Sequence, residues 1–75
     1  MNLPQETVEV PITGKIISVN VKKGDAVKEG DTLCILESMK MENPILAPVD
    51  GTISQVGVNN DQVVKPGETI AVIEY

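Results

Sequence analysis

Apolar residues along this chain alternate with polar ones in short runs that turn-forming residues separate. An alternating run places one face of a strand against a core, whereas no window keeps helical spacing for more than one turn. Gly-containing breaks of the kind found in turns lie between the runs. This pattern predicts an all-β sandwich or barrel. The alternating runs are Val8-Val10-Ile12, Ile17-Val19-Val21, Leu33-Ile35, Val56-Val58 and Ile70-Val72.

The second half of the chain repeats the first. Residues 11–38 align without a gap on residues 48–75, an offset of 37, and ten of the 28 pairs are identical. Two copies are too few for a solenoid and predict a closed structure with pseudo-two-fold symmetry. We expect two four-stranded antiparallel sheets wrapped into a flattened barrel, with the termini close together and the junction between repeats at the far end.

Domain limits and turns follow from the same repeat. Residues 1–7 are expected to form an N-terminal tail before a domain of residues 8–75. Asn60-Asp61 stands where the second copy would repeat Gly24-Asp25, which predicts a turn of a different type. Four glycines are interpreted as turn or bulge residues with positive φ or close backbone approach, rather than as phosphate cradles: Gly14, Gly30, Gly51 and Gly67.

Composition excludes several functions. The 75 residues carry 11 Asp and Glu against 6 Lys and Arg, a net charge of -5, which disfavours nucleic acid as a partner. The absence of His and the presence of one cysteine exclude a Ser-His-Asp or Cys-His catalytic set, a His/Cys zinc site and an intrachain disulfide. Cys34 alternates with apolar neighbours and pairs with Ala71 in the repeat, so it is interpreted as a small buried side chain. We therefore expect neither a catalytic residue nor a metal site.

No apolar run approaches the roughly 20 residues that a membrane span needs, and the N-terminus lacks the layout of a signal peptide. We therefore expect no direct insertion into a membrane. A lone unpaired thiol without an export signal predicts a cytoplasmic protein.

The junction between the repeats holds the candidate site. It reads Glu37-Ser38-Met39-Lys40-Met41-Glu42-Asn43-Pro44. If the strands end near Ser38 and resume near Met41, Lys40 lies at the tip of a tight, rigid turn with its amine in water. Methionines flank Lys40 where a turn ordinarily has polar residues, and Met is a soft side chain suited to adaptable contacts.

This junction resembles the biotin-attachment motif of biotinyl carrier domains, commonly E-A-M-K-M, with Ser38 in place of Ala. The flanks are similar to that family too: Val10-Pro11-Ile12-Thr13-Gly14, the turn Val21-Lys22-Lys23-Gly24-Asp25-Ala26-Val27, and Ala47-Pro48-Val49-Asp50-Gly51 after the hairpin. Lys40 lies 35 residues from the C-terminus, as the family's modified lysine typically does. Residues 22–31 are too short for the extra "thumb" of some acetyl-CoA carboxylase carriers, so the resemblance is to the thumbless type, a barrel-sandwich hybrid.

The resemblance implies a carrier and not a catalyst. Biotin protein ligase would attach biotin covalently to Lys40. A biotin carboxylase would then load a carboxyl group, and a carboxyltransferase of a biotin-dependent carboxylase, decarboxylase or transcarboxylase would exchange it. The resemblance also implies that Met39 and Met41 serve carboxyl transfer and partner contact, although partial packing on the barrel is an equal alternative. It assigns ligase recognition to Glu37, Ser38 and Glu42. Because Glu37 repeats as Glu74, a structural role at a strand end is an alternative for Glu37.

Three other interpretations stay open. Lipoyl domains share the fold, but their lysine usually follows Asp, whereas methionines surround Lys40. Membrane-fusion adaptors split a similar barrel with a long helical hairpin, whereas about eight residues separate the halves here. An unmodified interaction domain that retains the motif is the third. The chain is either a very small free-standing subunit or the C-terminal domain of a longer one.

Overall fold

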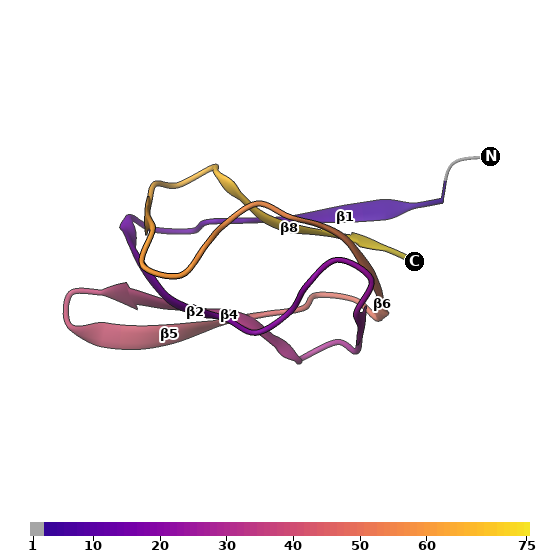
Figure 1. Ribbon diagram of the computed structural model, residues 1–75, viewed down its shortest axis with the longest axis horizontal. Coiled ribbons are helices and arrows are strands. Elements are labelled where there is room, and N and C mark those ends of the chain that lie inside the picture. Colours follow the sequence, from indigo (N-terminus) through magenta and orange to yellow (C-terminus); the bar gives the residue numbers. More distant parts are fainter. Residues whose placement is uncertain (1–2) are drawn as a thin grey trace.

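The computed structural model describes residues 3–75 as eight strands in two four-stranded antiparallel sheets (Figure 1). One sheet has the strand order β1-β8-β6-β3 and the other the order β5-β4-β2-β7. No helix occurs among these residues, so the predicted all-β barrel is confirmed. The strands are β1 (Gln5–Glu9), β2 (Gly14–Val19), β3 (Ala26–Val27), β4 (Thr32–Ser38), β5 (Met41–Leu46), β6 (Gly51–Val56), β7 (Val63–Val64) and β8 (Thr69–Glu74).

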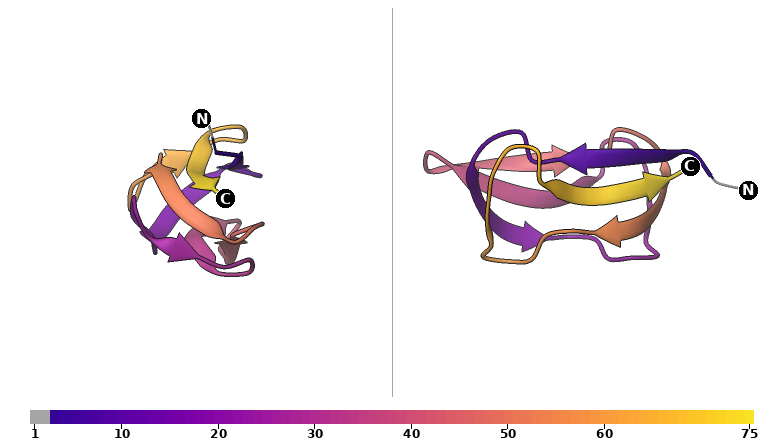
Figure 2. Two further views of the ribbon diagram at one scale, coloured as in Figure 1. Left: turned by 90° about the vertical axis from the view of Figure 1, so that its right-hand side faces the viewer. Right: turned by 90° about the horizontal axis from the view of Figure 1, so that it is seen from above.

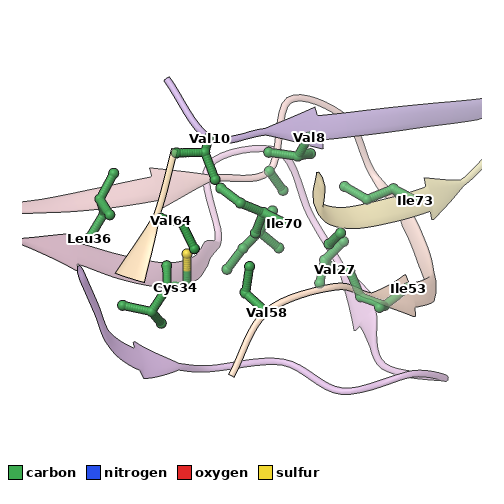
Figure 3. Packing of buried hydrophobic residues seen from close by; sticks show 14 residues of the cluster. Val8, Val10, Val27, Cys34, Leu36, Ile53, Val58, Val64, Ile70 and Ile73 are labelled. Carbon is green, nitrogen blue, oxygen red and sulfur yellow. The ribbon is translucent and has the colours of Figure 1, made fainter. Parts of the chain in front are cut away.

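A single apolar core lies between the two sheets (Figure 3). The predicted alternation holds for Val8 and Val10, but Leu33-Cys34 and Ile70-Ala71 are buried as adjacent pairs, and Ile17 and Ile35 of the predicted runs lie outside the core. β-branched residues dominate the core because they suit a pleated surface. The core contains no polar or charged side chain among the described residues. It consists of Val8, Val10, Ile16, Val27, Leu33, Cys34, Leu36, Ala47, Ile53, Val58, Val64, Ile70, Ala71 and Ile73.

The two halves repeat their hydrogen bonds as well as their sequence. The Ile16 amide donates to the Gln62 carbonyl at 2.8 Å, and the Ile53 amide donates to the Asp25 carbonyl at 2.8 Å. Both β2 and β6 contain a bulge at the same place, between Ile16 and Ser18 and between Ile53 and Gln55. The offset of 37 is therefore a structural pseudo-two-fold symmetry.

The turn around Asn60-Asp61 does not differ in type from its counterpart, and the sequence-based expectation is wrong here. At the offset of 37, Asp61 and not Asn60 corresponds to Gly24, and the two residues have φ values of 68° and 96°. The Gly24 amide donates to Ile53 and the Asp61 amide donates to Ile16, both at 2.7 Å. The turn is kept because Asp is one of the few residues that adopt this left-handed conformation without a prohibitive cost.

The four glycines have the backbone roles that the sequence predicts. Gly30 and Gly67 have φ values of 93° and 92°, a region that side chains disfavour. Gly14 and Gly51 begin β2 and β6, where a Cβ would collide with the carbonyl oxygens of residues 37 and 74 respectively. These close approaches fix the first residue of each strand against the strand next to it.

The molecule is elongated, with principal extents of 41 × 19 × 16 Å, and the chain termini lie at the end opposite the β4–β5 hairpin. The Tyr75 amide donates to the Pro4 carbonyl at 3.0 Å, which holds the two ends of the chain together. The β4–β5 hairpin projects from the other end in both long views (Figures 1 and 2). The predicted separation of termini and junction is confirmed.

The first strand begins earlier than expected. β1 runs from Gln5 to Glu9 and pairs with β8 along its whole length. Residues 5–7, which the sequence alone assigns to an N-terminal tail, therefore belong to the sheet; they are mostly polar because one face of this edge strand is in solvent. Residues 1 and 2 of that tail lie outside the described part of the chain.

Candidate cofactor-attachment site

Lys40 lies in a two-residue turn at the tip of the β4–β5 hairpin. β4 ends at Ser38 and β5 begins at Met41, and these two residues pair across the strands, as the sequence predicts. Met39 has φ 54° and Lys40 has φ 63°, so both central residues are left-handed, as in a type I′ turn. That turn matches the twist of the strands, which makes the hairpin a firm support for Lys40.

The turn residues are poorly suited to this backbone. Type I′ turns favour Asn-Gly, because a Cβ in the left-handed region meets the following carbonyl at a cost of about 1 kcal/mol per residue. Met39 and Lys40 both accept this cost. Backbone strain of this kind is common at functional sites, where a particular side chain is needed in spite of its unfavourable backbone angles.

The Lys40 side chain is exposed and unengaged. Within residues 3–75 the one ion pair joins the Lys15 ammonium to the Asp61 carboxylate at 3.8 Å and does not involve Lys40. Since no described carboxylate binds it, the Lys40 amine is available for acylation. A lysine must lose a proton before it attacks a carbonyl carbon, and the two-residue turn holds no base that could accept this proton.

The two methionines beside Lys40 are in solvent. Met39 is 91% exposed and Met41 is 66% exposed, so neither packs against the barrel. Between the two alternatives that the sequence left open, exposure favours contact with another molecule. An exposed thioether offers a deformable apolar surface to more than one partner.

Two carboxylates face each other below the turn. Glu37 on β4 pairs directly with Glu42 on β5. The pseudo-symmetric positions hold Glu74 and Gln5, whose side chains share a hydrogen bond of 3.1 Å from the amide nitrogen to the carboxylate. Like charges placed opposite each other in a sheet are destabilising. On its other side Glu37 pairs with Lys15 of β2, so the hairpin sheet carries a row of three charges in which the two carboxylates are not required by the fold.

Asn43 braces the hairpin, and the sequence analysis assigned it no role. Its side-chain amide donates to the carbonyl of Met41 at 3.2 Å and to that of Leu36 at 3.4 Å. Asn is uncommon within strands, and this is the signal that could have drawn attention to it. Ser38 is half-buried, and no side-chain hydrogen bond to it is seen among residues 3–75.

Other parts of the surface offer less. An open groove of about 520 Å³ lies on the pseudo-two-fold axis between the equivalent pairs Val19/Val56, Val21/Val58, Lys22/Asn59 and Lys23/Asn60, and Lys40 does not line it.

Cys34 is fully buried, and desolvation raises its pKa. Residues 3–75 contain no group of three or more Cys, Asp or Glu that could hold a metal ion. In the same range no helix is long and apolar enough to span a membrane.

Comparison with known proteins gives one consistent result. Residues 6–73 match the family model described as "Biotin-requiring enzyme". Over 42 residues the chain is 62% identical to methylmalonyl-CoA decarboxylase subunit gamma of Veillonella parvula, covering 56% of this chain and 33% of that protein. Over 40 residues it is 62% identical to glutaconyl-CoA decarboxylase subunit gamma of Acidaminococcus fermentans, covering 53% and 28%. The chain thus spans about a third of these relatives or less.

Solved structures agree with the sequence matches. The urea carboxylase of Kluyveromyces lactis superposes with a TM-score of 0.86 at 29% identity, covering 97% of this chain and 6% of that one. A single-chain, multi-domain long-chain acyl-CoA carboxylase gives the same score at 26% identity, covering 99% and 8%. The same barrel therefore occurs as a small part of much larger carboxylases.

Proposed function

The chain belongs to the biotin-requiring enzyme family, and we propose that it is a biotin carboxyl carrier in which biotin forms an amide with Lys40. The observation that carries the proposal is the exposed lysine at the tip of a strained two-residue turn, at the end of the barrel opposite the termini. A barrel that is held at the end with its termini can still present the hairpin with Lys40 to an active site on another protein.

The residues present fit the cofactor. The Nζ of Lys40 would form a bond to the activated carboxyl carbon of biotin, the leaving group would depart with its electron pair, and a proton would leave the amine. The product is a neutral amide, so the formal charge of the chain would change from -5 to -6. Exposure of the turn gives a ligase access to this amine.

Bound biotin supplies a ring nitrogen that accepts and releases a carboxyl group. The chain contributes placement and no chemistry of its own, as is usual for a protein that carries a cofactor. A rigid hairpin presents the arm, and tethering keeps it at an effective concentration of about a millimolar beside each partner. The partners would be a biotin carboxylase and a carboxyltransferase, and the carrier would work in the cytoplasm. Relatives named as decarboxylase gamma subunits support the coarser statement that the carrier is part of a multi-subunit enzyme.

We assign roles to the hairpin residues on the same basis. The exposed Met39 and Met41 would contact the enzymes that use the bound biotin. Glu37, Glu42 and Ser38 would be read by the ligase. The unfavourable pairing of Glu37 with Glu42 supports this, because its counterpart at the other end of the barrel is a hydrogen-bonded Gln–Glu pair.

Intact mass measured after co-expression with biotin protein ligase and biotin tests the acceptor. We expect wild type to gain the mass of biotin less one water, and Lys40→Arg to gain nothing. Lys40→Arg should keep the free energy of unfolding of wild type within about 0.5 kcal/mol, because the side chain is exposed. No gain on wild type, followed by a gain with lipoate and its ligase, would assign the chain to the lipoyl branch instead.

A further inference from the structure

The pseudo-symmetry makes each sheet an internal reference for the other. We call β5-β4-β2-β7 the hairpin sheet, because it carries Lys40, and β1-β8-β6-β3 the terminal sheet. Residues 37 positions apart occupy equivalent places in the two sheets, with the same bulges and registers. A difference between their outer faces is therefore not required by the fold.

Five apolar side chains cross the outer face of the hairpin sheet and form what we call the apolar stripe. Ile35 on β4 lies opposite Pro44 on β5, and Leu46 follows on the same face of β5. Ile17 is the extra residue in the β2 bulge that faces Ile35. Val63 on β7 pairs with Lys15 of β2, two residues before Ile17 on the same face, and therefore lies diagonally beside Ile17. The stripe is Val63, Ile17, Ile35, Pro44 and Leu46.

The stripe is open to solvent. Val63 is 67% exposed, Leu46 is 48% exposed and Ile17 is 37% exposed. Single exposed apolar residues are ordinary, but a cluster that reaches four strands is the form that interaction surfaces take. On its hairpin side the cluster borders the charged residues Lys15 and Glu37.

The equivalent face of the terminal sheet is much less apolar. Ser54 occupies the place of Ile17, and its hydroxyl donates to the Val72 carbonyl at 3.2 Å. The other equivalents are Thr7 for Pro44, Glu9 for Leu46 and Ala26 for Val63. Only Ile35 has a large apolar counterpart, Val72. The same sheet architecture thus forms with and without an apolar outer face. The fold therefore does not require the stripe.

We propose that the apolar stripe is a docking surface for the biotin protein ligase, an inference that rests on the proposed function of Lys40. The stripe continues directly from the hairpin, because Glu42, Pro44 and Leu46 alternate along one face of β5 below the turn. A ligase must reach the amine with nothing longer than the lysine side chain itself. It therefore has to approach closely enough to cover the strands that support the turn.

Charge decides against a second copy of this chain as the occupant. Each copy has a net charge of -5 and carries Glu37 opposite Glu42 at the hairpin end of the stripe. Two stripes brought face to face would place these carboxylates near one another, which costs free energy. A partner surface with an apolar centre and basic residues at its edge fits both features.

The decisive variant gives the hairpin sheet the residues of the terminal sheet. Ile17→Ser, Pro44→Thr and Val63→Ala together introduce the residues of the equivalent positions and leave the charge unchanged. With the ligase that modifies wild type, we expect kcat/KM for biotinylation to fall about tenfold, mainly through KM. The unfolding midpoint should stay close to that of wild type, because the twin sheet already tolerates these residues.

A matched pair of single variants separates docking from packing. Ile35→Thr and Val72→Thr change equivalent, half-buried positions on the outer faces of the two sheets. We expect only Ile35→Thr to slow biotinylation. Equal rates for wild type, the triple variant and both single variants would overturn the proposal, as would equal losses in Ile35→Thr and Val72→Thr.

Three outcomes of these experiments lead to different conclusions. If wild type sediments as a dimer and the triple variant as a monomer, a second copy occupies the stripe and the ligase proposal is wrong. If wild type is not biotinylated at Lys40, the proposed function itself fails, and the docking proposal fails with it. Biotinylation of wild type with an unchanged rate for the triple variant refutes the docking proposal alone.

Discussion

Met39 and Lys40 are held in a backbone conformation that their residue types disfavour. Both have left-handed backbone angles, φ 54° and 63°, in a turn that Asn and Gly would occupy more comfortably. The hairpin still forms because six register pairs join β4 to β5 and Asn43 donates to two carbonyls near the turn. The supporting strands impose the turn, and the turn sets Lys40 apart from the rest of the barrel.

Relieving this strain should stabilise the protein. We expect Met39→Asn to raise the free energy of unfolding by about 0.5–1 kcal/mol, because Asn adopts the left-handed region more readily than Met. In a domain of this size the midpoint of thermal unfolding would rise by about 4 °C. Met41→Asn is the control, since Met41 lies in a strand, where Asn brings no gain. A midpoint for Met39→Asn at or below that of wild type would contradict the strain.

At the scale of elements, the two ends of the barrel are built alike and charged differently. Glu37 and Glu42 face each other in the hairpin, whereas Glu74 and Gln5 share a hydrogen bond near the termini. The repeat in the sequence predicts which residues correspond. The expectation that the strands around Lys40 end near Ser38 and resume near Met41 is confirmed. It could not show which of the equivalent pairs are bonded, because that depends on side-chain positions across strands.

Copying the terminal pair into the hairpin tests this difference. Glu42→Gln should raise the free energy of unfolding by about 0.5 kcal/mol, because it removes a repulsion and permits the amide–carboxylate hydrogen bond of the other end. The gain should shrink in 1 M salt, where exposed charges are screened. Urea unfolding at low and high salt measures it. Glu9→Gln, on the outer face of β1 and also exposed, is the control and should change little.

The whole molecule explains what the sequence could and could not reveal. Period-two apolar runs and the 37-residue repeat suffice to predict two sheets around one core. Strand burial and internal symmetry both leave a regular pattern in the order of the residues. The turn at Asp61 and the start of β1 at Gln5 escaped prediction. Asp61 substitutes for a glycine by tolerating a left-handed angle, and β1 gains its first residues from pairing with β8, the distant end of the chain.

Cys34 reports on the integrity of this core. It is fully buried, and desolvation raises its pKa above the ordinary value of 9.0. Above that pH the unfolded chain loses the thiol proton while the folded chain keeps it, so the unfolded state binds fewer protons and stability falls as pH rises. Below pH 9 the contribution of this group is constant.

The effect can be isolated with the residue of the other half. Cys34→Ala installs the side chain that Ala71 provides at the equivalent core position, and it has no titrating group. Between about pH 9 and 11, we expect the free energy of unfolding of wild type to fall more steeply than that of Cys34→Ala, by up to about 1.4 kcal/mol per pH unit. Every other ionisable group is present in both proteins, so its contribution cancels in the difference. Parallel curves would mean that the thiol ionises within the folded barrel, and rapid labelling of Cys34 by a thiol reagent at neutral pH would show that this core opens far more often than its packing implies.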